Sequence, residues 1–343
     1  MIWMSYRKIL MEVENNFFES RSDITPAFFI MEQFYQTFNL RIPSPVQKIS
    51  CESDYVSNIY VKRDDLIHPI ISGNKFRKLK YILIDFFNSK KSKIIAFGGQ
   101  YSNLLHALSE ITLQLKIDAH FYIMSHGNQV INPTLEFIKK NGVKITYLSK
   151  SEFRSIRNPD YLNQLKENNP EAYIIPEGAS NFLATIGSGE IIAELKDQFP
   201  EFPDYIIMDM GTGGTFAGVL SQLPANTKLI GIPILKGVDW KKTLNNIYID
   251  QVDYSKKNYE IIEDYHFGGF AKWNIELIKF INNYKFKNEI PLDPIYTGKL
   301  VFAVYDLLNN GFFSQNSKIL WIHGGGLQGI EGFNLLYNDL INV

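Results

Sequence analysis

From residue 93 to residue 323 the chain alternates short apolar runs with longer amphipathic stretches, and no other feature constrains the fold as strongly. The apolar runs are rich in Ile and aromatic residues, which is typical of buried strands. They span residues 93–97, 120–124, 143–148, 173–175, 205–210, 228–232 and 318–323. The stretches between them that predict helices include 102–115, 133–141, 184–198, 274–284 and 298–310. This alternation predicts an α/β fold with mostly parallel, twisted sheets and helices on both faces.

The length and the N-terminal segment bear on domain organisation. At about 150 residues per domain, 343 residues predict two domains, and 45% apolar with 21% charged residues exclude a disordered chain. Thr25 and Pro26 fit an N-cap followed by proline at the first helical position, which predicts a helix over 27–38. The proline-containing segment 41–45 ends it. We therefore expect residues 1–40 to form an appendage.

Charge, hydropathy and cysteine usage exclude several classes of protein. The net charge of -1 offers no basic excess for nucleic acid, and no uncharged apolar run reaches the roughly 18 residues that a membrane helix needs. The single cysteine, Cys51, cannot form an intrachain disulfide and excludes a zinc site with two or more thiolates. The first residues contain no continuous apolar segment of a signal peptide. We expect a cytoplasmic protein without nucleic-acid, membrane or metal partners.

The strongest candidate site is a glycine-rich loop directly after the run at 205–210. Open parallel sheets bind ligands at the carboxyl ends of their strands. The loop reads Gly211, Thr212, Gly213, Gly214 and Thr215 and precedes a predicted helix. Glycines let backbone N–H groups turn inward, and the helix adds its positive end, which favours a phosphate. The spacing fits neither a nucleotide-triphosphate loop nor the dinucleotide fingerprint, and a simple tight turn remains the alternative.

Two further glycine clusters follow strands. Gly98-Gly99 precedes Ser102 and Asn103, which stand at a helix start, where both residue types also act as ordinary caps. Gly324-Gly325-Gly326 follows the last strand and fits a sharp turn, and His323 beside it fits a hydrogen-bonded core histidine. Neither cluster indicates a function when taken alone.

A basic segment at 72–80 contains one lysine in an unusual position. Arg77, Lys78 and Lys80 fit the solvated face of a helix, whereas Lys75 directly follows Ser-Gly-Asn at the helix entry. A lysine that a loop end delivers into a cleft with a phosphate cradle is a candidate Schiff-base lysine. Such an amine must be partly desolvated so that its neutral, nucleophilic form is available.

Eight segments, in this order, resemble the pyridoxal-phosphate enzymes of the tryptophan-synthase-β type (fold type II). Their more specific resemblance is to the 1-aminocyclopropane-1-carboxylate deaminase/D-cysteine desulfhydrase family. The segments are VKRDDL (61–66), SGNKFRKLKY (72–81), FGGQYSN (97–103), PEGASN (176–181), GTGGTFAG (211–218), YHFGG (265–269), PLDPIYTGK (291–299) and HGGGLQG (323–329). One glycine loop is weak support, whereas eight motifs in the family's order are specific.

The resemblance implies pyridoxal 5′-phosphate as cofactor, with Lys75 holding it covalently and moving the substrate α-proton. The loop 211–215 would hold the phosphate. Asn103 would bind the 3′-oxygen of the cofactor, and Ser102 would contact the substrate carboxylate or take part in proton transfer.

The substrate side follows from the same resemblance. Tyr296 and Tyr265 would line it, and Thr297 would lie near the pyridine nitrogen. The family fold implies a larger cofactor domain from 41–78 and 185–343, with a smaller α/β domain, 79–184, inserted between. The site would lie in the cleft between these domains, and closure would assemble it. The resemblance also implies a homodimer that acts on a small amino acid.

Three residues depart from the family pattern. Leu104 stands where many relatives carry a polar residue, and Phe270 stands where a second tyrosine is expected. Gly324 stands where family members carry Thr or Leu, so a side chain is missing at the pyridine-nitrogen end of the pocket. The group that meets this nitrogen is therefore open.

The leading functional expectation is β-elimination from D-cysteine, which yields pyruvate, sulfide and ammonia. Ring-opening relatives carry a glutamate at the position of Thr297, and a neutral hydroxyl there makes the ring a weaker electron sink. A weaker sink suffices when a thiolate leaves. The alternatives are a 1-aminocyclopropane-1-carboxylate deaminase and, from another class, a binding protein for pyridoxal phosphate or another phosphate ligand without turnover. Thr297 also fits a simple cap of the helix that follows.

Overall fold

The computed structural model describes residues 34–50, 58–125, 132–156, 158–248 and 256–342. Its strands are β1 (Val46–Ile49), β2 (Asn58–Lys62), β3 (Lys93–Gly99), β4 (Asp118–Met124), β5 (Lys144–Leu148), β6 (Ala172–Ile175), β7 (Tyr205–Met210), β8 (Lys228–Pro233), β9 (Tyr259–Ile261) and β10 (Lys318–Ile322). They form a six-stranded sheet in the order β1-β2-β10-β7-β8-β9 and a four-stranded sheet in the order β5-β4-β3-β6. Every strand pair is parallel except β1–β2. The predicted α/β fold with mostly parallel sheets is confirmed.

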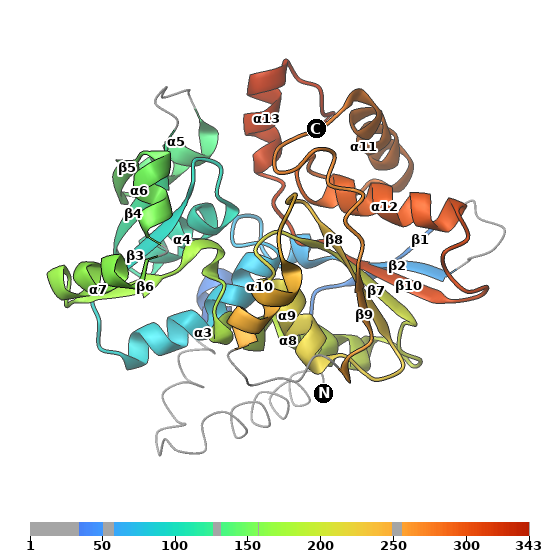
Figure 1. Cartoon of the computed structure of the whole chain (residues 1–343), viewed down its shortest axis with the longest axis horizontal. Helices are drawn as coiled ribbons and strands as arrows, with labels where there is room; N and C mark the ends of the chain where they lie inside the picture. The colour runs from blue at the N-terminus through green and yellow to red at the C-terminus, as the bar shows by residue number, and fades with distance from the viewer. Residues whose placement is uncertain (1–33, 51–57, 126–131, 157, 249–255, 343) are drawn as a thin grey trace.

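Helices cover both faces of each sheet (Figure 1). The four-stranded sheet packs against α4 (Asn103–Gln114) and α5 (Pro133–Lys140) on one face and against α6 (Lys150–Ser155) and α7 (Pro159–Asn168) on the other. The six-stranded sheet lies between α8 (Phe182–Gln198), α9 (Gly214–Gln222) and α10 (Trp240–Tyr248) and, opposite, α11 (Ile275–Asn288), α12 (Thr297–Asn309) and α13 (Gly329–Tyr337). The short helices η1 (Asp64–Leu66) and η2 (Glu177–Ala179) and the long helix α3 (Asn74–Asn88) complete the described elements. All strands of the smaller sheet fall within the predicted insert 79–184, whose boundaries stay a prediction.

All seven predicted strands are present, but β1, β2 and β9 were not predicted. β1 has two adjacent polar residues, and β2 alternates polar and apolar residues and ends at Lys62, so neither shows a continuous apolar run. Most of the predicted helix 27–38 lies outside the described residues, as does Cys51. Residues 34–38 are helical, and the Phe34 ring lies 6.1 Å from that of Phe76 in α3. In the described part of the chain no helix is long and apolar enough to cross a membrane.

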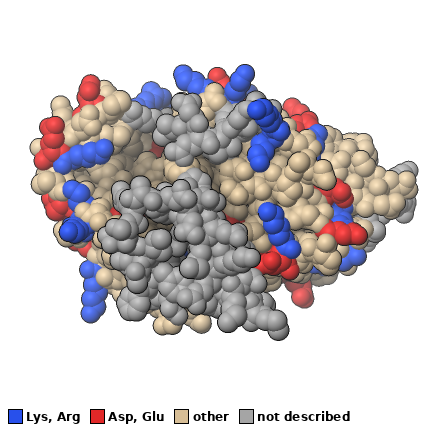
Figure 2. All heavy atoms as spheres, turned by 90° about the horizontal axis from the view of Figure 1, so that it is seen from below, with Lys and Arg blue, Asp and Glu red and all other residues tan. Residues whose placement is uncertain are grey.

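The charged residues of α3 correct one sequence-based interpretation. Arg77, Lys78 and Lys80 were expected on a solvated face, but they are only 0%, 3% and 1% exposed. Each has polar partners that compensate for burial. Lys80, for example, lies 2.5 Å from Glu190 of α8. By contrast, Figure 2 shows surface Lys and Arg interspersed with Asp and Glu over the described part of one face.

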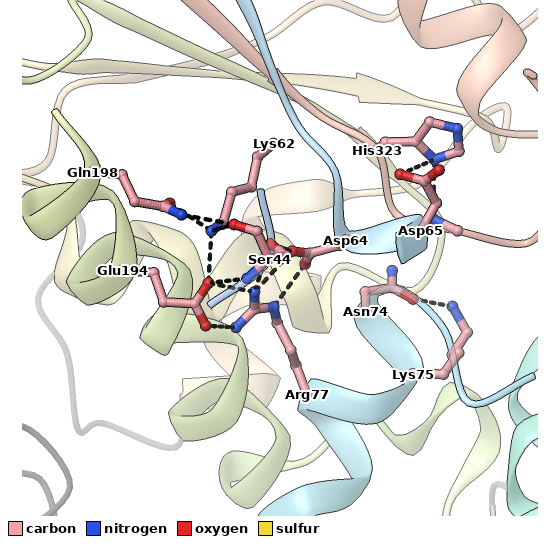
Figure 3. A network of polar contacts seen from close by, with 11 residues as sticks. Ser44, Lys62, Asp64, Asp65, Asn74, Lys75, Arg77, Glu194, Gln198 and His323 are labelled. Atoms are coloured by element: carbon pink, nitrogen blue, oxygen red, sulfur yellow. Dashed lines mark hydrogen bonds and ion pairs between the residues drawn. The ribbon is translucent and has the colours of Figure 1, made fainter. Parts of the chain in front are cut away.

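A buried ionic network fixes α3 against β2 and α8 (Figure 3). Arg77 contacts Asp64 at 2.6 Å and Glu194 at 2.9 Å, and these side chains are fully buried. Lys62 donates to the same Glu194 at 2.6 Å. Although burial opposes it, the two cations lower the pKa of Glu194 to about 2. The network therefore holds the helix that carries Lys75.

We expect Glu194→Gln to lower the free energy of unfolding by about 3–5 kcal/mol, because it leaves buried cations without their counter-charge. Urea or guanidinium denaturation of both proteins measures the difference. The matched control is Glu260→Gln, since Glu260 pairs with Lys228 at the surface. An exposed pair contributes about 0–1 kcal/mol. Equal losses in both variants would contradict a specific role for the network.

Candidate active site

The glycine loop connects β7 to the N-terminus of α9. Gly213 has a φ of 85°, in the left-handed region, where a residue with a side chain is strained. It is the N-cap of α9, and no side chain caps this helix. The first N–H groups of a helix lack intrahelical partners and carry the positive end of the helix dipole. The loop 211–215 therefore has the geometry of an anion cradle.

Lys78 reaches this cradle from α3. Its Nζ donates to the carbonyl of Gly178 at 2.7 Å and to the hydroxyls of Ser180 at 3.3 Å and Thr212 at 3.4 Å. A Cβ on Gly214 would lie 3.0 Å from the same Nζ. Burial, then the charge of Lys75, lower the pKa of Lys78 to about 7. A phosphate beside it would favour the charged form.

Sequence reasoning missed Lys78. Its spacing from Lys75 was the available signal, since residues three apart on a helix share a face. The expectation of a solvated lysine failed because α3 packs against α8, whose neighbour is α9.

Lys75 lies in the first turn of α3, at the entry that its sequence setting predicts. Its Nζ donates to the side chain of Asn74. Burial lowers the pKa of Lys75 to about 8, although Asp209 and Asp293 oppose the shift. The neutral amine is then far more populated near pH 7 than in an ordinary lysine with a pKa of about 10.4. This is the property that a Schiff-base lysine requires.

Two carboxylates that sequence reasoning missed lie near Lys75. Asp209 stands two residues before the cradle, near the end of β7. Asp293 precedes α12 and accepts backbone N–H groups of Ile295 and Tyr296 at 2.9 and 2.8 Å. Burial, then the charge of Asp293, raise the pKa of Asp209 to about 6. An acidic residue inside an otherwise buried apolar strand was the signal for Asp209.

Tyr296 and Thr297 follow Asp293 in the chain. A Cβ on Gly211 would lie 3.3 Å from Cε1 of Tyr296, so this ring borders the cradle. Burial, then Asp293 and Asp209, raise the pKa of Tyr296, which keeps its hydroxyl protonated at neutral pH. The Thr297 hydroxyl donates to Asp293 at 2.7 Å and accepts its backbone N–H at 2.9 Å. The hydroxyl thus stabilises the turn that precedes α12, whose N-cap is Tyr296 and not Thr297. Its place at the pyridine nitrogen stays a prediction.

The Tyr265 hydroxyl forms a hydrogen bond with a residue outside the cradle. It donates to Asp306 of α12 at 2.7 Å. The aromatic neighbour of Tyr296 is instead Phe270, with ring centroids 6.3 Å apart and an edge-on arrangement. Phe270 is 55% exposed. No described contact joins Tyr265 to the cradle, so its role at the substrate side stays a prediction.

The other two glycine clusters meet each other. Ser102 is the N-cap of α4 and accepts the N–H of Leu105 at 3.3 Å. Asn103 accepts the side-chain amide of Gln328, and a Cβ on Gly326 would lie 2.7 Å from Asn103 Nδ2. The loop 324–326 therefore comes against the start of α4.

The same loop meets the entry of α3. The carbonyl of Gly324 accepts the N–H of Asn74 at 3.2 Å, and a Cβ on Gly73 would lie 1.9 Å from that carbonyl oxygen. His323 bonds to the carbonyl of Pro291 at 2.9 Å and accepts the N–H of Gly325 at 3.3 Å, as expected of a core histidine. Because only glycine permits this approach at residue 73, loop 324–326 fixes the segment that presents Lys75.

The described residues combine an anion cradle with a desolvated lysine, and this pair fits a phosphate-bearing aldehyde. No group of three or more His, Cys, Asp or Glu side chains within the described ranges could hold a metal ion. The family profile described as "Pyridoxal-phosphate dependent enzyme" matches residues 38–325. The chain belongs to this family. Its cofactor is therefore pyridoxal 5′-phosphate, and the protein is a fold type II enzyme.

Individual relatives indicate which group of this family the chain belongs to. The chain is 32% identical to a "Putative 1-aminocyclopropane-1-carboxylate deaminase" of Pyrococcus furiosus, over 83% of this chain and 90% of the relative. It is 26% identical to the "D-cysteine desulfhydrase" of Salmonella paratyphi C, over 85% and 94%. A solved "ACC deaminase homologue" superposes with a TM-score of 0.74 at 26% identity, over 89% and 98%. This pyridoxal-phosphate enzyme is thus a member of the 1-aminocyclopropane-1-carboxylate deaminase/D-cysteine desulfhydrase group.

Proposed function

We propose that the protein is a lyase that eliminates the β-substituent of a small amino acid, with D-cysteine as substrate and pyruvate, sulfide and ammonia as products. One observation carries the proposal: Lys75, with a pKa lowered to about 8, lies one helical turn from Lys78 at the phosphate cradle. This arrangement suits an amine that both bonds to an aldehyde and accepts a proton.

In this proposal the residues around the two lysines hold the cofactor. Loop 211–215, Lys78 and the hydroxyl of Ser180 bind the phosphate, since all three meet at Thr212 or Gly214. Lys75 holds the aldehyde carbon covalently, and Asn103 binds the 3′-oxygen. The Ser102 hydroxyl accepts an N–H in capping α4, so its own proton stays available to the substrate carboxylate.

Proton transfer is assigned to Lys75. Its amine would accept the substrate α-proton, and the cofactor, when bound, would supply the electron sink. Tyr296, protonated and beside the cradle, would line the substrate side, with Phe270 edge-on against its ring. The proposed domains, 41–78 with 185–343 and 79–184, would close over the substrate and exclude water.

The leaving group decides between the two candidate substrates. A thiol has a pKa of about 8.5, so a thiolate leaves without a strong acid beside it. Position 297 offers a neutral hydroxyl already bound to Asp293, and Phe270 adds no proton donor. These residues suit departure of a thiolate better than opening of a carbon ring.

Ring opening of 1-aminocyclopropane-1-carboxylate is the second candidate. Relatives carrying the deaminase name support it, and so do two carboxylates close enough to Lys75 to raise its pKa against burial. A carboxylate near the ring can strengthen the electron sink that this reaction needs.

A screen of the purified holoenzyme for keto-acid release tests the proposal. The substrates are D-cysteine, L-cysteine, β-chloro-D-alanine, D-serine and 1-aminocyclopropane-1-carboxylate. We expect the highest kcat/KM for D-cysteine or β-chloro-D-alanine. A higher value for 1-aminocyclopropane-1-carboxylate than for both would replace the proposal with the deaminase. A yellow protein inert to every substrate would favour a binding protein without turnover.

Assembly and location stay predictions. The homodimer rests on the resemblance, and sedimentation equilibrium of the purified protein tests it. The proposed cytoplasmic location rests on the single cysteine, which is typical of a reducing compartment.

A further inference from the structure

The carboxylate of Asp209 is the group in the site whose task the family pattern leaves undefined. It belongs to β7 and precedes Gly211 by two residues, so it lies at the strand end from which the cradle begins. Within the described residues, no other side chain hydrogen-bonds to it, whereas Asp293 is committed to capping α12. A carboxylate beside the cradle that accepts no hydrogen bond from another side chain can accept one from a bound ligand.

The residues around Asp209 show which part of the site its carboxylate faces. A Cβ on Gly324 would lie 3.5 Å from Asp209 Oδ1 and 3.5 Å from Asn74 Nδ2. These are ordinary van der Waals distances, so a side chain at residue 324 would contact the carboxylate, and glycine leaves that contact unmade. The family pattern expects residue 324 at the pyridine-nitrogen end of the pocket. Asp209 therefore faces the position from which the usual side chain is missing.

The charge of the site also suits a cation at this position. Lys75 and Lys78 are the cations that face Asp209, and Asp293 and Tyr296 are the other titratable groups near it. In the proposed site Lys75 is bonded to the aldehyde carbon, and Lys78 is assigned to the phosphate. Asp209 then lacks a cationic partner of its own. A protonated pyridine nitrogen is a cation that would supply one.

We propose that Asp209 binds the pyridine nitrogen of the cofactor and keeps it protonated, in place of the side chain that Gly324 lacks. The proposal rests on the proposed cofactor role of Lys75. The ring nitrogen is para to the carbon that carries the aldehyde, so its partner must lie across the ring from Lys75. An acidic partner strengthens the ring as an electron sink. Thr297, already bound to Asp293, then need not supply this charge.

Nitrogen NMR of the cofactor tests the proposal. Apoenzyme is reconstituted with pyridoxal 5′-phosphate that carries ¹⁵N in its ring, and the ¹⁵N shift is followed against pH. We expect a protonated ring at neutral pH in the parent protein. In Asp209→Asn the midpoint of the titration should fall by about 1–3 pH units, because a neutral amide replaces the carboxylate.

Asp85→Asn is the matched control. Asp85 lies on α3, ten residues along the helix from Lys75, and its carboxylate accepts the hydroxyl of Tyr173. We expect this variant to keep the parent midpoint. Asp209→Ser repeats the test with a smaller side chain if the asparagine variant does not fold.

Two results would overturn the proposal: a neutral ring in the parent protein, or an unchanged midpoint in a folded Asp209 variant. The second would make Asp209 a counter-charge for the lysines only. Neither result refutes the proposed β-elimination, which fails instead if the parent protein does not link the cofactor to Lys75 or releases no keto acid.

Discussion

Lys75→Ala is expected to lower keto-acid release by about 10³-fold or more, because it removes both the covalent anchor of the cofactor and the base that takes the α-proton. The absorbance of protein-bound Schiff base should disappear with it. Absorption spectra and steady-state kinetics of the reconstituted variant measure both effects. The preserved cradle should still bind the cofactor noncovalently through loop 211–215 and Lys78.

Lys166→Ala is the control for this variant, since Lys166 is exposed on α7 and has no assigned role. It should keep the parent spectrum and rate. A Lys75→Ala protein that still forms the Schiff base and turns over at the parent rate would assign the chemistry to another lysine, with Lys78 first to be examined.

Gly214→Val is expected to weaken cofactor binding by about 100-fold or more, which is about 2.8 kcal/mol. A Cβ at this position would lie 3.0 Å from Lys78 Nζ and 3.1 Å from Ser180 Oγ. The branched methyl groups would then occupy the space where these polar groups meet and block the approach of a phosphate. Fluorescence titration of the apoenzyme with cofactor measures the change.

The control here is Gly329→Val, because a Cβ on Gly329 would have no neighbour within 4 Å. Circular dichroism should show that both variants remain folded. Parent affinity in folded Gly214→Val would mean that the loop is only a turn between β7 and α9.

Strands whose apolar residues are continuous could be predicted from the sequence, because both faces of a parallel sheet are buried. The run 205–210 became β7, and its position fixed the glycine loop at the carboxyl end of the strand. The same reasoning missed β2, whose Lys62 is buried but paired with Glu194, 132 residues later in the chain. A long-range ion pair leaves no local pattern in the sequence.

The residues of the candidate site also differ in whether the local sequence marks them. Lys75 and loop 211–215 stand out locally, by their glycines and their position at element ends. Lys78 and Asp209 do not, because their importance comes from α3, β7 and loop 324–326 meeting in space. Thr297 was placed at the ring by resemblance, and only the structure shows that its hydroxyl is bound to Asp293.

Borohydride reduction of the holoenzyme, followed by proteolysis and mass mapping of the pyridoxyl-labelled peptide, tests the central claim most directly. Reduction converts the covalent linkage into a stable one, so the label marks the lysine that held the cofactor. We predict a single label on Lys75. A label on Lys78, on Lys80 or on any other lysine would contradict the assignment, and so would a protein that takes up cofactor without becoming labelled.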